Sequence, residues 1–290
     1  MPQVRFTDYK ALARAISLVE NESAGYEDLL RTLQPSAIPV IGFTGPPGAG
    51  KSTLLNALVG LLLDQGKKVG LVLVDPSSPF NFGALLGDRL RMSAYFNHPN
   101  LFIRSLASRG SMGGLSDKIV EVLEVMKAFA FDYILVETVG VGQGEVEIAG
   151  LADTTVVVLV PEAGDGVQTM KAGLMEIADI YVINKADRPD AESLFNSLQL
   201  QLQIGGKEIP VLKTVAVEGK GVEHLLNELQ TQQASPKNKE RRALLMSEKA
   251  LRLIAKIRMR DFDKAKLKKE IAEAMQQPAF NLYSFISRYC

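Results

Sequence analysis

A glycine-rich segment at residues 45–53, GPPGAGKST, restricts the fold of this chain more than any other feature. It follows an apolar run at residues 38–44 and precedes a leucine-rich stretch at residues 52–66 that has helical spacing. An apolar strand that leads through a tight glycine-rich loop into a helix is the start of a β-α-β unit. Since such units build parallel sheets, the segment predicts an α/β fold.

Further apolar runs alternate with helical segments after this loop. Strands of a parallel sheet are buried on both faces and therefore appear as nearly continuous apolar runs. We predict a mostly parallel sheet, flanked by helices, within a domain at residues 36–232. The predicted strands after the first lie at residues 69–75, 101–106, 133–138, 154–161, 180–187 and 209–217.

Helical segments flank this domain at both ends. Residues 1–35 are predicted to form a helical extension that is broken near residues 21–25. Residues 233–290 follow a polar linker, and residues 237–270 contain 13 lysines and arginines against five acidic residues. The apolar residues among them have helical spacing. This C-terminal arm presents either a solvated basic face or a surface for dimerisation.

The glycine-rich loop also has the pattern G-x-x-x-x-G-K-[ST], in which backbone N–H groups surround phosphate oxygens. Lys51 is expected to reach the β- and γ-phosphates, and the Ser52 hydroxyl to bind Mg²⁺. A glycine-rich turn with a chance Lys-Ser pair is the alternative, but the strand before it and the helix after it favour a P-loop NTPase. The predicted phosphate contacts are Gly45, Pro46, Pro47, Gly48, Ala49, Gly50, Lys51, Ser52 and Thr53.

A second motif, NKAD, follows the apolar run at residues 180–183. The carboxylate of Asp187 can accept hydrogen bonds from N1–H and the exocyclic amine of guanine, whereas adenine presents an acceptor at N1. A site built in this way rejects the wrong base by roughly 10⁴-fold. Together with the P-loop, the motif indicates a guanine nucleotide, with Asn184, Lys185 and Asp187 at the base.

Carboxylates at the ends of two predicted strands indicate a magnesium site. Glu137 ends the run YILVE and Asp75 ends VGLVLVD. Strand-end acids in an open α/β sheet face the ligand crevice. Glu137 could hold the water shell of Mg²⁺, and the N–H of Gly140 could meet the γ-phosphate. A loop glutamate without function is the alternative for Glu137.

Composition excludes several other classes of protein. The 33 basic and 33 acidic residues balance, so no overall field attracts nucleic acid or an anionic membrane. One cysteine and two histidines cannot form a thiolate or histidine-rich metal cluster. Apolar runs are too short to span a bilayer, and the N-terminal residues lack the apolar core of a signal peptide. We expect a cytoplasmic protein, with an imported protein whose transit peptide is absent from this sequence as the alternative.

The motifs together resemble the MeaB/ArgK family of P-loop GTPases. The resemblance rests on GPPGAGKST, VDPSSP, LLGDRLRM, RGSMGGLS, ETVGVGQGE, PEAGDGVQTMKAGLMEIAD and NKAD, in family order over about residues 38–225. It implies binding of GTP and GDP with Mg²⁺, and a homodimer joined through the C-terminal arm. It also implies a chaperone that protects an adenosylcobalamin-dependent acyl-CoA mutase, such as methylmalonyl-CoA mutase, and gates its cofactor loading.

The same resemblance implies roles for further residues. Asp88 of LLGD would join Ser52, Asp75 and Glu137 at Mg²⁺. Residues 164–171 would form a switch loop from which Lys171 approaches the nucleotide. The turn that contacts the base would contain Val215, Ala216 and Val217. Departures from the family pattern at residues 79–83, Gly144 and Glu162 affect the switch details and the turnover rate rather than nucleotide binding.

Three alternatives belong to other functional classes. A nickel-insertion GTPase would need histidine and cysteine clusters that this chain lacks. A kinase or ATPase tied to amino-acid transport conflicts with the guanine motif. A binding module without useful hydrolysis would differ from an enzyme in single-turnover measurements. We expect slow intrinsic hydrolysis, since no residue stands out as an arginine finger.

Overall fold

The computed structural model describes residues 3–34, 36–75, 92–107, 118–138, 148–161, 176–233 and most of 243–289. Further gaps lie at residues 244–245, 248–249, 252, 256, 260–261 and 277–278, and the side chains of Asp75 and Ser93 are also outside the described part. The chain divides into two compact units, Met1–Arg242 and Ala243–Cys290.

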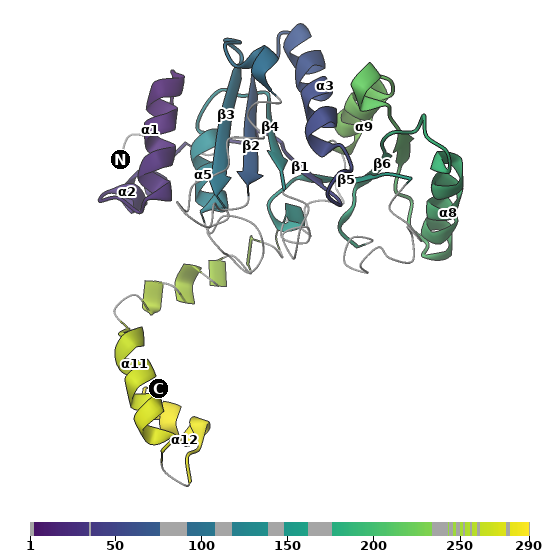
Figure 1. The fold of residues 1–290 in the computed structure, drawn as a ribbon. Coiled ribbons are helices and arrows are strands. Elements are labelled where there is room, and N and C mark those ends of the chain that lie inside the picture. Colours follow the sequence, from purple (N-terminus) through teal and green to yellow (C-terminus); the bar gives the residue numbers. More distant parts are fainter. Residues whose placement is uncertain are drawn as a thin grey trace. The chain divides into compact units, whose positions relative to one another are not determined.

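The first unit is built on a seven-stranded sheet in the order β3-β2-β4-β1-β5-β6-β7, in which every pair of neighbours is parallel (Figure 1). This confirms the predicted α/β fold. β1, β4, β5 and β6 are buried along their whole length, as expected for strands covered on both faces. The strands are β1 Val40–Thr44, β2 Val69–Asp75, β3 Leu101–Ala107, β4 Tyr133–Glu137, β5 Thr154–Leu159, β6 Ile180–Ile183 and β7 Val211–Lys213.

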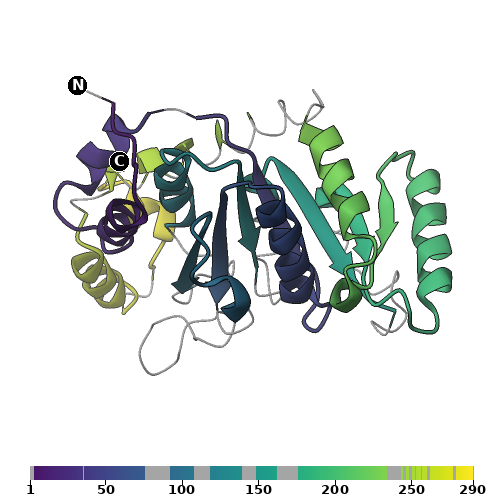
Figure 2. The same ribbon diagram turned by 90° about the horizontal axis from the view of Figure 1, so that it is seen from above.

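Two apolar layers enclose the sheet. α3 (Lys51–Asp64) and α9 (Val222–Gln233) share one core with inward side chains such as Phe43 and Leu71. The opposite face is covered by α1 (Tyr9–Glu20), α2 (Tyr26–Thr32) and α5 (Ile119–Lys127) near β2 and β3, and by α8 (Ala191–Ile204) near β5 and β6. Figure 2 shows α1 and α8 at opposite ends of the sheet.

Short 3₁₀ turns complete the first unit. They are η1 Ser93–Tyr95, η2 Ile148–Gly150 and η3 Ala216–Glu218. Tyr95 of η1 packs against α3 at Gly60, where a Cβ atom would lie 2.5 Å from the tyrosine hydroxyl.

The N-terminal helices pack on the sheet rather than extending from it. Leu12, Ile16 and Val19 of α1 are fully buried in the same core as Phe102 of β3 and Met126 of α5. α1 begins at Asp8, whose side chain accepts a hydrogen bond from the N–H of Ala11 at 2.8 Å. The predicted extension at residues 1–35 therefore shares the hydrophobic core of the first unit.

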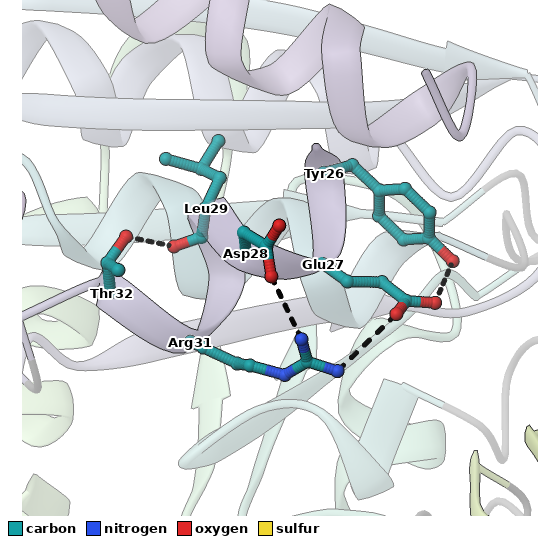
Figure 3. Close-up of polar contacts among 6 residues, drawn as sticks. All are labelled: Tyr26, Glu27, Asp28, Leu29, Arg31 and Thr32. Carbon is teal, nitrogen blue, oxygen red and sulfur yellow. Dashed lines mark hydrogen bonds and ion pairs between the residues drawn. The ribbon is translucent and has the colours of Figure 1, made fainter. Parts of the chain in front are cut away.

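Side-chain contacts along α2 stabilise this short helix (Figure 3). Arg31 donates to Asp28 at 2.9 Å and to Glu27 at 3.4 Å, and Glu27 also accepts from the Tyr26 hydroxyl at 3.2 Å. The Thr32 hydroxyl donates to the carbonyl of Leu29 at 2.8 Å, within the last turn. Acidic side chains at the N-terminal end and a basic one at the C-terminal end also suit the helix dipole.

The second unit contains α11 (Lys264–Ala274) and α12 (Leu282–Ile286). The Asp263 side chain caps α11 by accepting from Ala265 and Lys266 N–H at 2.9 Å, and Asn281 caps α12. Phe285 is its most buried apolar side chain among those described, next to Phe280 and Tyr289. Among the described residues of either unit, no helix is both long and apolar enough to cross a lipid bilayer.

Candidate nucleotide-binding site

The glycine-rich loop leaves β1 at the carboxyl edge of the sheet and enters α3. Two of its glycines are required by geometry. Gly45 has φ +137°, and a Cβ atom there would lie 2.1 Å from the carbonyl oxygen of Val158. Gly50 has φ +83°, and its Cβ would lie 2.3 Å from Nδ2 of Asn184. The backbone thus follows the neighbouring strands more closely than any side chain would allow.

Lys51 is the first residue of α3, and only 6% of it is exposed. Its ammonium donates to the carbonyl oxygens of Gly45 at 2.8 Å and Pro46 at 3.1 Å. The cation therefore lies against the loop itself. It reinforces the positive potential that the free N–H groups at the start of a helix create.

Ser52 and Glu137 meet in the buried interior of the site. The Ser52 hydroxyl donates to Glu137 Oε1 at 2.7 Å, across 85 residues of sequence. The contact arises because β4 pairs with β1, so that Glu137 is in register with Phe43, close to the start of the loop. The structure thus brings together two residues that the sequence predicts at a common magnesium site.

The next residue, Thr138, fixes this corner of the site. Its N–H donates to the carbonyl of Phe43 at 3.1 Å and its hydroxyl donates to the Thr44 hydroxyl at 3.1 Å. The sequence motifs alone do not assign a role to Thr138. A buried threonine directly after a strand-end glutamate is the signal that could have found it.

Asn184 joins three segments that are distant in sequence. Its Nδ2 donates to the carbonyl of Ala49 in the glycine-rich loop at 2.9 Å. Its Oδ1 accepts from the Thr214 hydroxyl at 3.1 Å and from the N–H of Ala216 at 3.2 Å. With 2% of the residue exposed, Asn184 acts as a buried bridge between the loop after β1 and the loop after β7.

The other base-site candidates lie around this bridge. Asp187 is exposed, and Lys185 has the left-handed φ of +55°. The N–H of Ala186 donates to the carbonyl of Thr214 at 3.0 Å, which places the NKAD motif beside the loop after β7. In that loop Val215 and Ala216 are buried, whereas Val217 is 81% exposed.

Several predicted site residues cannot be placed. Asp88, Gly140 and Lys171 lie outside the described residues, as do residues 79–83, Gly144, Glu162 and the predicted switch at residues 164–171. Asp75 ends β2, where its backbone pairs with Ala107. Among the residues that the structure describes, no group of three or more histidine, cysteine, aspartate or glutamate side chains could hold a metal ion alone.

Comparison with known proteins is consistent with this geometry. The sequence family described as "Methylmalonyl Co-A mutase-associated GTPase MeaB" matches residues 12–270. A protein of Pyrococcus abyssi is 48% identical over 231 residues, which cover 77% of this chain and 71% of that protein. The fused isobutyryl-CoA mutase of Cupriavidus metallidurans is 39% identical over 202 residues, which cover 68% of this chain and 18% of that protein.

A solved structure supports the fold. The crystal structure of an LAO/AO transport system kinase superposes with a TM-score of 0.65 over 98% of this chain and 97% of that one, at 24% sequence identity. At this identity the likeness concerns the fold alone. The family match covers most of the sequence, however, and the resemblance drawn from the motifs is confirmed. This chain belongs to the MeaB family of GTPases.

Proposed function

We propose that this protein is a cytoplasmic, Mg²⁺-dependent GTPase that serves as chaperone of an adenosylcobalamin-dependent acyl-CoA mutase. The observation that carries the nucleotide part of the proposal is the junction at the carboxyl edge of the sheet. There Asn184 of the guanine motif is hydrogen-bonded to Ala49 of the phosphate loop. Base and phosphate recognition are therefore supported by one connected set of residues.

In this proposal the residues of the loop hold the phosphates. Backbone N–H groups of the loop, which Pro46 and Pro47 lack, would surround phosphate oxygens, and Lys51 Nζ would exchange its two carbonyl partners for the β- and γ-phosphates. Such an exchange requires little rearrangement, because the ammonium already lies against the loop, 2.8 Å from the carbonyl oxygen of Gly45. Positioning and charge neutralisation account for most of the catalysis of phosphoryl transfer.

The Ser52–Glu137 pair fits a magnesium site. A hydroxyl and a carboxylate are hard oxygen donors, and Mg²⁺ is usually held by one or two such groups together with phosphate oxygens. Ser52, Glu137, Asp75 and Asp88 are the proposed ligands, directly or through water. When bound, Mg²⁺ would neutralise charge on the β- and γ-phosphates. The N–H of Gly140 is proposed to meet the γ-phosphate.

For the base, we propose that the carboxylate of Asp187 accepts the hydrogen bonds from guanine. Lys185 and the turn at Val215, Ala216 and Val217 are proposed to contact the ring. The exposure of Asp187 supports this assignment, since a ligand can reach it from solvent. Asn184 holds the two loops together, and its remaining donor capacity is available to the nucleotide.

A mutase partner is supported by two comparisons. The matched family is described by its association with methylmalonyl-CoA mutase. One relative carries its matching segment within a fused isobutyryl-CoA mutase. We propose that this chain meets a separate mutase, which it protects and whose cofactor loading it gates. Residues 164–171 with Lys171 would report the state of the γ-phosphate, and a homodimer would form through residues 233–290.

The decisive experiment compares nucleotides and then adds the partner. Titration of the parent protein should show GDP binding at least about 10²-fold tighter than ADP, and Asp187→Asn should abolish that preference. The neighbouring Asp190→Asn is the control and should keep it. GTP hydrolysis should then be faster with methylmalonyl-CoA mutase than without it. Equal binding of GDP and ADP by the parent would reject the guanine assignment, and no stimulation by any acyl-CoA mutase would reject the chaperone role.

A further inference from the structure

We propose that Thr138 is a positioning residue for magnesium binding, which fixes the end of β4 and thereby holds Glu137 against Ser52. The inference rests on the proposed magnesium site at Ser52 and Glu137, and it adds a residue from the opposite face of the sheet. Its basis is a pair of buried threonines, Thr44 and Thr138, which join the ends of β1 and β4.

Glu137 and Thr138 direct their side chains to opposite faces of the sheet. Glu137 reaches the α3 face, where its Oε1 accepts a hydrogen bond from the Ser52 hydroxyl at 2.7 Å. Successive residues of an extended strand alternate between the faces. The N–H of Thr138 continues the ladder by donating to the carbonyl of Phe43 at 3.1 Å, so this alternation extends to Thr138. The threonine side chain is therefore directed away from the ion that Ser52 and Glu137 would share.

A pair of hydroxyl groups joins the two strand ends on that second face. Thr138 Oγ1 donates to Thr44 Oγ1 at 3.1 Å, and the carbonyl oxygen of Phe43 lies 3.4 Å from the same hydroxyl. Thr138 is 3% exposed, and Thr44 is fully buried. A buried hydroxyl that loses its partner is costly, because water cannot replace that partner. The pair is therefore a fixed contact between β1 and β4.

The position of this contact explains why it matters for the ion. Thr44 is the last residue of β1 and immediately precedes Gly45, whose carbonyl accepts a hydrogen bond from Lys51 at 2.8 Å. The threonine pair thus ties the start of the phosphate loop to the residue after Glu137. Mg²⁺ demands near-ideal octahedral geometry, and groups that orient its ligands typically contribute roughly 10- to 100-fold to metal affinity. A small shift of Glu137 should therefore weaken Mg²⁺ binding more than nucleotide binding.

The test measures how much Mg²⁺ the full chain needs. The concentration for a half-maximal effect is obtained from the affinity for a non-hydrolysable GTP analogue and, separately, from GTP hydrolysis. Thr138→Val keeps the shape without the hydroxyl and should raise this concentration about tenfold, while the analogue affinity in EDTA stays within twofold of the parent. Thr44→Val should have the same effect, because it removes the other half of the pair. Thr138→Ser, which keeps the hydroxyl, should stay within twofold of the parent.

Thr155→Val is the matched control. Thr155 is also a fully buried threonine of the sheet, in β5, and its hydroxyl has no hydrogen-bond partner within the part of the chain that the structure describes. This variant should keep the Mg²⁺ requirement of the parent. An equal rise in Thr155→Val and Thr138→Val would overturn the proposal, because general loss of packing would then explain both. A lower urea midpoint for Thr138→Val with an unchanged Mg²⁺ requirement would also overturn it, since the role would then be structural alone.

A double variant tests whether Thr138 acts through Glu137. Glu137→Gln alone should raise the Mg²⁺ requirement, and adding Thr138→Val should raise it less than twofold further. An undiminished effect of Thr138→Val in that background would overturn the proposal. If Thr138→Val behaves as the parent while Glu137→Gln does not, this inference fails and the magnesium site stands. If Glu137→Gln has no effect, the proposed magnesium site fails, and this inference fails with it.

Discussion

The side chain of Asn184 connects the loop after β1 to the loop after β7. Its amide satisfies one carbonyl, one hydroxyl and one N–H group, all buried and all from other segments. A polar group that loses its partner inside a protein is costly, because water cannot replace the partner. We therefore expect the residue to matter for stability as well as for nucleotide binding at the proposed site.

We expect Asn184→Ala to lower the free energy of unfolding by about 2–3 kcal/mol. GDP and ADP binding should both weaken, because the phosphate loop loses its anchor at Ala49. Thr214→Val removes only one of the three hydrogen bonds and should cost about 1 kcal/mol. Urea unfolding and nucleotide titration would check both variants. An unchanged unfolding midpoint in Asn184→Ala would show that the bridge contributes nothing.

Lys51 and Ser52 should matter for chemistry far more than for folding. Lys51→Ala removes the cation at the phosphates and Ser52→Ala removes a magnesium ligand, so each should slow GTP hydrolysis by about 10²-fold or more. Far-ultraviolet circular dichroism should stay that of the parent. Lys67→Ala, which removes an exposed lysine beyond the far end of α3, is the control and should hydrolyse GTP normally. Normal hydrolysis by folded Lys51→Ala would contradict the assigned mechanism.

The sequence predicts those parts of the site that are local and misses those that depend on strand order. The loop at residues 45–53 can be identified from the sequence, because its residues are consecutive and their spacing is set by the geometry of a single phosphate-binding loop. The bridge from Asn184 to Thr214 and Ala216 could not be foreseen, since it depends on β6 lying between β5 and β7. The pairing of Ser52 with Glu137 was expected only as a shared metal site, and the direct hydrogen bond is a finding of the structure.

At the scale of elements, α8 shows why one helix was not predicted. Apolar residues at positions 198, 200, 202 and 204 alternate with three glutamines, which is the pattern of a strand. In the structure Leu198 and Leu202 are buried, whereas Leu200 and Ile204 are exposed. The buried residues Leu198 and Leu202 therefore have the four-residue spacing of a helix. They pack against side chains of β5 and β6, and this contact favours the helix over a strand.

The strand predicted at residues 209–217 is shorter in the structure for a related reason. β7 ends at Lys213, after three residues. The N–H of Thr214 still donates to the carbonyl of Ile183 in β6 at 2.9 Å, but the Thr214 hydroxyl and the N–H of Ala216 bond to Asn184. Apolar composition favoured a longer strand, but two hydrogen bonds to a buried amide end it.

The glycine-rich loop offers a test in which steric room and backbone strain are separated. Gly45→Ala meets both obstacles, since φ is +137° and the new Cβ would lie 2.1 Å from a backbone oxygen. Gly48→Ala meets only the backbone strain, because φ is +76° and nothing lies within 4 Å of the new Cβ atom. We expect Gly48→Ala to cost about 1–2 kcal/mol of unfolding free energy and Gly45→Ala clearly more. Equal costs in denaturant melts would mean that the loop can move away from Val158.

At the scale of the whole molecule, the two compact units differ in how much apolar surface they bury. The first has three clusters of buried apolar side chains around its sheet. In the second, several large apolar side chains are exposed, among them Leu251, Ile254 and Ile257. Their spacing of three residues places them on related faces of a helical segment, as a surface for a second copy of the chain requires.

We expect Leu251→Glu combined with Ile254→Glu to convert a dimer into a monomer. Charged side chains are tolerated at exposed positions of a monomer but not in an apolar interface. GDP affinity should be retained, because the site lies in the first unit. Lys268→Glu, in α11 of the same unit, is the control and should stay dimeric. Size-exclusion chromatography with light scattering gives the mass. A parent protein that is monomeric at all concentrations would refute the dimer arm.

The central place of β1 has a consequence for how the chain is made. β1 is synthesised first among the strands but pairs with β4 and β5, and Leu159 at the end of β5 lies 115 residues after Thr44. At translation rates of about 5–20 residues per second, β1 waits roughly 6–23 s for both partners. Until β4 and then β5 are synthesised, this apolar strand has at least one open edge. The nascent chain thus depends on slow, long-range closure of the sheet around its central strand.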